Sequence, residues 1–100
     1  MRFLVILDAR SAIGGSYAKG NNDGFMNDGN IQHPVLDCLE VATDAPYYLF
    51  AKRDMSNQGK QYQSLYIPHG SVVAIYCYSD EGSKPCGFIT PRYDVPGESA

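Results

Sequence analysis

The stretch that most constrains the fold runs from Gln61 to Ser79 and holds no Asp, Glu, Lys or Arg in nineteen residues. Charged residues make up 19% of the whole sequence, so this run is unusual within it. Its pattern predicts two strands that meet at a corner, Pro68-His69-Gly70. Leu65 and Ile67 alternate with polar and tyrosine residues in the first strand, whereas both faces of the second are apolar or aromatic.

A strand with two apolar faces needs cover on both sides. A chain of 100 residues has little material to provide that cover and to build a core elsewhere. We therefore expect a second copy of the chain to supply part of it. The predicted subunit interface consists of Leu65, Ile67, Val73, Ile75 and Tyr76.

The composition favours an all-β domain. Eight Tyr, four Phe and no Trp, with many Val and Ile, are typical of strands, and scattered Gly and Pro separate short elements. Residues 1–91 are predicted to form one domain, and residues 92–100 a loose tail. We expect six or seven strands and no helix, in a small, strongly bent barrel. Besides the two strands of the uncharged run, strands are predicted at Phe3–Leu7, Pro34–Val41, Tyr47–Ala51 and Gly87–Thr90, with a bulge at Cys38-Leu39 in the second of these. Between them the sequence predicts a turn and weak strand over Asp8–Lys19, a loop over Gly20–Asn30 and a turn over Thr43–Pro46.

Charge and cysteine content indicate which ligands and which cellular compartment suit the protein. A net charge of −3 argues against a general binder of polyanions. Cys38, Cys77 and Cys86 form no CxxC pair, and the first two lie in apolar runs, so we expect buried structural thiols and a reducing compartment. The apolar run Phe3–Leu7 is too short for a signal peptide, and no segment has the length of a membrane span. The sequence predicts a cytoplasmic protein.

Evidence for catalysis or metal binding is weak. The Asn- and Asp-rich run after Gly20 lacks the Glu of an EF-hand loop, so an Asx-rich turn is the simpler interpretation. His33 and His69 have no matched carboxylate or Cys pattern for zinc, and Ser71 lies too close to His69 in sequence to form a nucleophile and base pair. We therefore predict no enzyme activity, metal, cofactor or small-molecule substrate.

Lys52 and Arg53 form the basic concentration in the middle of the chain. They are either a solvated strand end or a contact for phosphates, which a symmetric assembly would multiply.

Two short motifs resemble those of the Sm and LSm family. Ile67 to Ile75, IPHGSVVAI, is similar to the second motif, in which a strand ends in Ile-Arg-Gly and an apolar strand follows. Asp23-Gly24-Phe25-Met26-Asn27 is similar to the first, Asp-x-Phe-Met-Asn. His69 stands where the family has Arg, which removes a permanent cation. The chain looks like a divergent member of phage or environmental origin.

The resemblance implies a five-stranded barrel in which the last strand pairs with the preceding strand of a neighbour. Repetition of this pairing closes a ring, here expected to be a pentamer to heptamer. Single-stranded RNA would bind near the pore, and the resemblance assigns this contact to Asp23, Phe25, Asn27, His69, Gly70 and Ser71, with Lys52 and Arg53 nearby.

The leading hypothesis is thus a non-enzymatic, ring-forming protein that binds single-stranded RNA. The alternative is a structural or adaptor protein, such as a phage assembly component, that uses the barrel for protein contacts. A small hydrolase that uses His69 and Asp8, Asp23 or Asp37 is a third interpretation.

Overall fold

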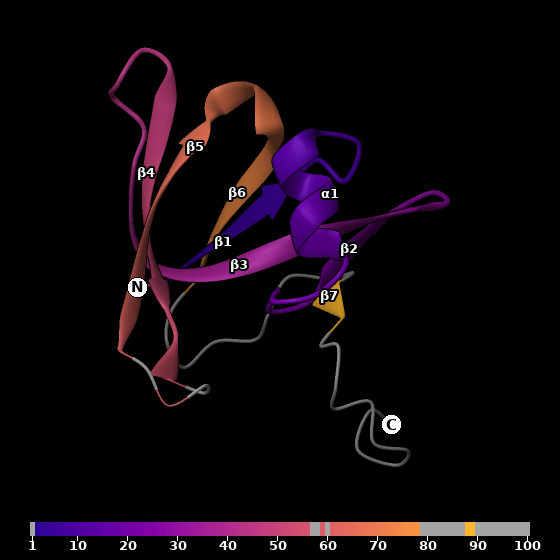
Figure 1. Ribbon diagram of the computed structural model, residues 1–100, viewed down its shortest axis with the longest axis horizontal. Helices are drawn as coiled ribbons and strands as arrows, with labels where there is room; N and C mark the ends of the chain where they lie inside the picture. The colour runs from indigo at the N-terminus through magenta and orange to yellow at the C-terminus, as the bar shows by residue number, and fades with distance from the viewer. Residues whose placement is uncertain (1, 57–58, 60, 79–87, 90–100) are drawn as a thin grey trace.

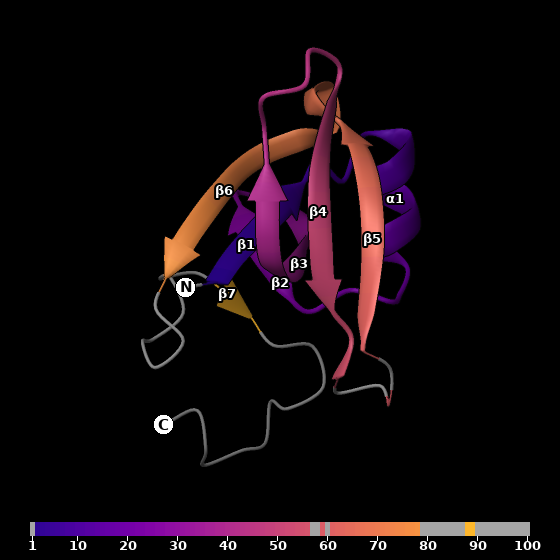
Figure 2. The same cartoon turned by 90° about the vertical axis from the view of Figure 1, so that its left-hand side faces the viewer.

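The strand β1 (Arg2–Leu7) lies inside the sheet with a neighbour on each side, as its unbroken apolar run predicts. In this computed structural model, which describes residues 2–56, 59, 61–78 and 88–89, β1 pairs antiparallel with β3 (Ile31–Ala42) and β6 (Val72–Tyr78). Beyond β3 follow β4 (Tyr48–Asp54) and β5 (Tyr62–Pro68), which gives the order β5-β4-β3-β1-β6. Figure 2 shows these strands as one curved sheet with β5 and β6 at its margins.

Two short strands extend this sheet. β2 (Phe25–Asp28) pairs with the first residues of β3, and β7 (Phe88–Ile89) pairs with β2 (Figure 1). The long β3 therefore contacts β2, β1 and β4 in succession along its length. Its register against β4 shifts between Cys38 and Glu40, which confirms the predicted bulge.

The all-β class is confirmed, with five main strands and extra short ones. Among the described residues β5 pairs with β4 alone and β6 with β1 alone, so the sheet is open and not a closed barrel. The predicted corner is the 3-10 turn η2 (His69–Ser71) between these two strands. The predicted tail, residues 92–100, lies outside the described residues.

The prediction of no helix was wrong. The helix α1 (Ala12–Ala18) occupies the segment that was predicted as a turn and weak strand. Ser11 caps it, because its Oγ accepts a hydrogen bond from the Gly14 N–H at 3.0 Å. Gly14 is required here, since a Cβ at this position would lie 1.8 Å from the carbonyl oxygen of Asp8. Ile13 and Tyr17 pack against the core and stabilise a helix that its two glycines disfavour.

The prediction of a loop over Gly20–Asn30 was also partly wrong, because β2 forms within it. The positions expected to take positive φ do so at Asn21, Gly24 and Gly29. Gly29 and Asn30 form the two-residue turn that joins Asp28 to Ile31 in the β2–β3 hairpin.

The core lies on both faces of the sheet centre. One cluster contains Val5, Leu7, Leu36, Cys38, Leu49, Ala51 and Ile67, and a smaller one on the other face contains Leu4, Ile6 and Val35. Cys38 is buried as predicted, whereas Cys77 is exposed, which corrects the prediction for that thiol; Cys86 lies outside the described residues. None of the described helices is long and apolar enough to cross a membrane.

Candidate functional site

The two margins of the sheet are the first candidate site. β5 and β6 are seven residues each and carry no charged side chain. Each presents one open edge among the described residues, whereas natural proteins usually protect such edges with charges, proline or covering segments. Pro68 is the last residue of β5, and β6 contains no proline.

The predicted interface residues divide into two groups. Ile67 is fully buried in the core, and Leu65 and Ile75 pack against the same cluster, so these three side chains do not form an exposed seam. This corrects the prediction, because the alternation of each strand turns them inward. Val73 and Tyr76 are 48% and 41% exposed, as an interface requires. The described part of the chain thus leaves one side of β6 without full cover.

A group of exposed tyrosines accompanies the β5 edge. Tyr48, Tyr62 and Tyr66 are 51%, 54% and 71% exposed, and Tyr66 contacts Phe50 of β4 with ring centroids 5.5 Å apart. Lys52 lies over the Tyr62 ring at 4.3 Å. Its ammonium is also 3.5 Å from Glu40, so much of its charge is compensated.

The structure gives Arg53 and Asp23 a different role from the predicted contact with RNA. Arg53 is fully buried, and its Nε and Nη2 donate to the Asp23 carboxylate at 3.0 and 3.1 Å. The same carboxylate accepts the Asp37 N–H at 2.8 Å, and the Tyr17 ring lies 5.8 Å from the guanidinium. This pair fastens the loop before β2 to β4, so neither charge is exposed to a phosphate.

Residues of the second predicted RNA-binding loop, His69 to Ser71, also make contacts within the protein. His69 Nε2 donates to the Ala45 carbonyl at 2.7 Å, which ties η2 to the β3–β4 connection. Ser71 is buried and its carbonyl accepts the Asp8 N–H at 2.8 Å, whereas Gly70 is exposed. Phe25 is half-buried and Asn27 is exposed, both on β2. No contact described between these residues joins the two predicted RNA loops into one surface.

A cluster of charged side chains stabilises the N-terminal end of β1. Arg2 donates to Asp37 at 3.3 Å and to Asp54 at 2.6 Å, and the Tyr78 hydroxyl donates to Asp37 at 3.2 Å. Partial burial by itself would raise the pKa of Asp54, but the hydrogen bonds from Arg2 and Ser56 outweigh it and lower the pKa to about 2. The same two carboxylates outweigh desolvation of Arg2 and raise the pKa of its guanidinium.

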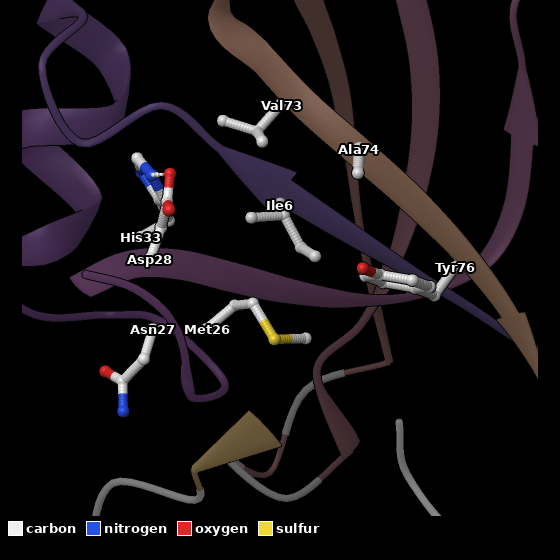
Figure 3. A pocket seen from close by; sticks show the side chains of 8 residues that line it. All are labelled: Ile6, Met26, Asn27, Asp28, His33, Val73, Ala74 and Tyr76. Atoms are coloured by element: carbon white, nitrogen blue, oxygen red, sulfur yellow. Dashed lines mark ion pairs between the residues drawn. The ribbon is translucent and has the colours of Figure 1, made fainter. Parts of the chain in front are cut away.

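A cleft of about 330 Å³ lies between β2 and β6, over β1 (Figure 3). Val73 projects into it because β6 has an extra residue there, with Val72 opposite Leu7 and Ala74 opposite Ile6. His33 lies at one end beside Asp28, whose Oδ2 is 3.7 Å from the imidazole Nε2. The cleft is lined by Ile6, Met26, Asn27, Asp28, His33, Val73, Ala74 and Tyr76.

The sequence pattern makes His33 at most a weak zinc ligand and does not predict this cleft. The missed signal is the alternation of β3, which places His33 on the same face as the core residue Val35. The described residues contain no group of three metal-binding side chains.

No family model, curated protein or solved structure matches this chain.

Proposed function

We propose that this protein is a non-enzymatic assembly module, a structural or adaptor protein that builds homo-oligomers through its sheet margins. The β5 edge of one copy would pair with the β6 edge of the next. The observation that carries the proposal is the pair of uncharged edges at opposite margins of one sheet, both open in the part of the chain that the structure describes.

The occupant of each edge is a second copy because the two edges complement each other. Both strands are seven residues long, so they can pair along their full length. Neither brings a charge to the contact that would have to be buried or repelled. A contact between two different margins is heterologous, and its repetition produces a closed ring when the rotation closes. The resemblance to Sm-like proteins, which form such rings, is consistent with this choice.

Light scattering tests the assembly with charges placed on β5. We expect the natural chain at micromolar concentration to have a multiple of its 11.0 kDa mass. Ser64→Asp combined with Tyr66→Asp puts two charges on the β5 edge and should shift the mass to that of the monomer. Thr43→Asp with Tyr47→Asp adds the same charge at exposed positions of the β3–β4 connection and should leave the oligomer intact. A natural chain that is monomeric would overturn the proposal.

Binding of single-stranded RNA is the second candidate, and the exposed tyrosines beside Lys52 favour it. Tyrosine rings stack on bases of any sequence, and the part of the Lys52 charge that Glu40 leaves uncompensated would attract phosphates. The burial of Arg53 and the net charge of −3 weaken this candidate relative to protein contacts. A salt-dependent titration with oligo-U and oligo-A tests it, and the absence of binding even at low salt would reject it. Tyr66→Ala should abolish binding if the tyrosines are the platform.

A further inference from the structure

The cleft between β2 and β6 has a polar end and an apolar body. Its volume of about 330 Å³ lies near the lower limit for sites that hold small molecules. Ile6, Met26 and Ala74 provide the apolar surface, and the Tyr76 ring borders it (Figure 3). His33 and Asp28 lie together at the other end. A ligand for this space must be small and largely apolar, with its polar atoms at one side.

The hydrogen bond from Ala9 determines which nitrogen of the His33 imidazole acts as the acceptor. Ala9 N–H donates to Nδ1 at 3.0 Å, so Nδ1 uses its lone pair and the proton resides on Nε2. The residue is 1% exposed, and Nε2 has no hydrogen-bond partner among the described residues. Buried polar groups are almost always satisfied, so a bare N–H donor here points to a missing acceptor. A metal ion is unsuitable, because the nitrogen beside Asp28 carries a proton.

Asp28 places an acceptor beside this donor. Its Oδ2 is 3.7 Å from Nε2, which is too long for a hydrogen bond, so both atoms keep their capacity for a ligand. The carboxylate is 74% exposed at the last residue of β2. It can therefore turn aside without disturbing the core and admit a ligand atom to Nε2.

A donor beside an acceptor is the complement of a cis amide, whose carbonyl oxygen and N–H lie on one edge. We propose that this cleft binds a small lactam-type ligand, a ring that contains a cis amide. The ligand carbonyl accepts from His33 Nε2–H, and the ligand N–H donates to the Asp28 carboxylate. The carbons of the ring lie against Met26, Ile6 and Ala74. The hydrogen bonds of this site use neither strand edge, although Val73, Ala74 and Tyr76 of β6 line the cleft.

The test uses NMR on the full chain with 2-piperidone as the probe. We expect saturable shifts of the Met26 and Ala74 methyl signals and of the His33 imidazole nitrogen, with millimolar affinity. N-methyl-2-piperidone keeps the carbonyl and lacks the N–H, so it should bind at least 5-fold more weakly. Equal affinity for the two probes, or no saturable shift with 2-piperidone, would overturn the proposal.

Variants distinguish binding through these two hydrogen bonds from non-specific binding of a small molecule in the cleft. Asp28→Ala should weaken 2-piperidone at least 5-fold and leave the weak affinity for the N-methyl compound unchanged, whereas Asp44→Ala, at an exposed loop carboxylate, should change neither. Ala74→Met should fill the cleft and abolish binding of both probes. If Asp28→Ala binds 2-piperidone as the natural chain does, the assignment is wrong. If the Met26 and Ala74 methyl shifts appear with rising protein concentration and no probe in the Ser64→Asp/Tyr66→Asp variant, whose β5 edge is blocked, a second copy occupies the cleft and the lactam site is refuted.

Discussion

Replacement of Asp23 by Ala should destabilise the fold far more than its place in an Asn- and Gly-rich loop would indicate. The change leaves the buried Arg53 guanidinium with two long contacts, to Gln63 Oε1 at 3.3 Å and Asn21 Oδ1 at 3.5 Å. It also removes the acceptor for the Asp37 N–H. The variant therefore keeps a positive charge inside the protein and loses the group that compensates it.

The expected loss of unfolding free energy follows from the burial of the Arg53–Asp23 pair. Arg53 is 0% exposed and the Asp23 side chain 9%, so solvent screens their attraction little. Removal of one partner of such a pair costs about 3–5 kcal/mol. A domain of this size has a total stability of about 5–15 kcal/mol, so Asp23→Ala should lose a large part of it. The melting temperature should fall by at least about 12 °C, at about 4–8 °C per kcal/mol.

Urea and thermal unfolding followed by circular dichroism measure this effect. Asp44→Ala removes an exposed carboxylate and should change the free energy of unfolding by less than about 0.5 kcal/mol. Arg53→Met removes the buried charge itself, so combined with Asp23→Ala it should restore part of the loss, and the double-mutant cycle should give a coupling above about 1 kcal/mol. A loss below about 1 kcal/mol for Asp23→Ala would refute the structural role of the pair.

Three further outcomes follow from the described contacts. Gly14→Ala should lower the free energy of unfolding, measured by urea titration, by about 3 kcal/mol, because the new Cβ would lie 1.8 Å from a backbone oxygen. Gly15→Ala has its nearest contact at 3.4 Å and should be neutral or stabilising. Equal effects of the two substitutions would contradict the helix geometry. The pKa of Asp54 is lowered from 3.8 to about 2, so its stabilisation is present above about pH 4 and is lost as the pH falls towards 2; we expect about 1 kcal/mol, reduced by solvent screening, and Arg2→Met should weaken this pH dependence of the unfolding free energy, leaving the part that comes from Ser56. Burial raises the pKa of Cys38 to about 12, so mass spectrometry should find it unmodified by iodoacetamide at pH 8 until urea unfolds the chain; rapid labelling of the native protein would contradict its burial.

The sequence predicts the strands well where apolar runs or alternation are strong. β1 and the β5-corner-β6 unit lie where the pattern places them, and the bulge in β3 occurs at the predicted switch. The helix α1 was missed because Gly14 and Gly15 lower its intrinsic propensity, and tertiary packing decides its formation. β2 was missed because its stability comes from pairing with β3, which a local reading of an Asn- and Gly-rich segment does not reveal.

The sequence likewise predicts only part of the candidate site. A basic residue after an apolar run is usually exposed, which made Arg53 a candidate for phosphate contact. Its alternation with Leu49 and Ala51 places it on the buried face, and this signal was available in the sequence. The partner of its charge, Asp23, lies thirty residues away in sequence and required the structure. The open edges follow from strand order, which alternation alone does not give.

Cross-linking across the β5–β6 contact tests the assembly most directly. Ser64→Cys places a thiol in the middle of β5, and the natural Cys77 provides an exposed thiol on β6; Cys86 is replaced by Ser to remove a third site. A linker with a reach of about 10 Å spans about three residues of strand register. We predict a covalent ladder of dimers, trimers and higher species with Ser64→Cys, and none when Cys77 is also replaced by Ser. A result with only monomers, or a ladder that persists without Cys77, would contradict assembly through these two edges.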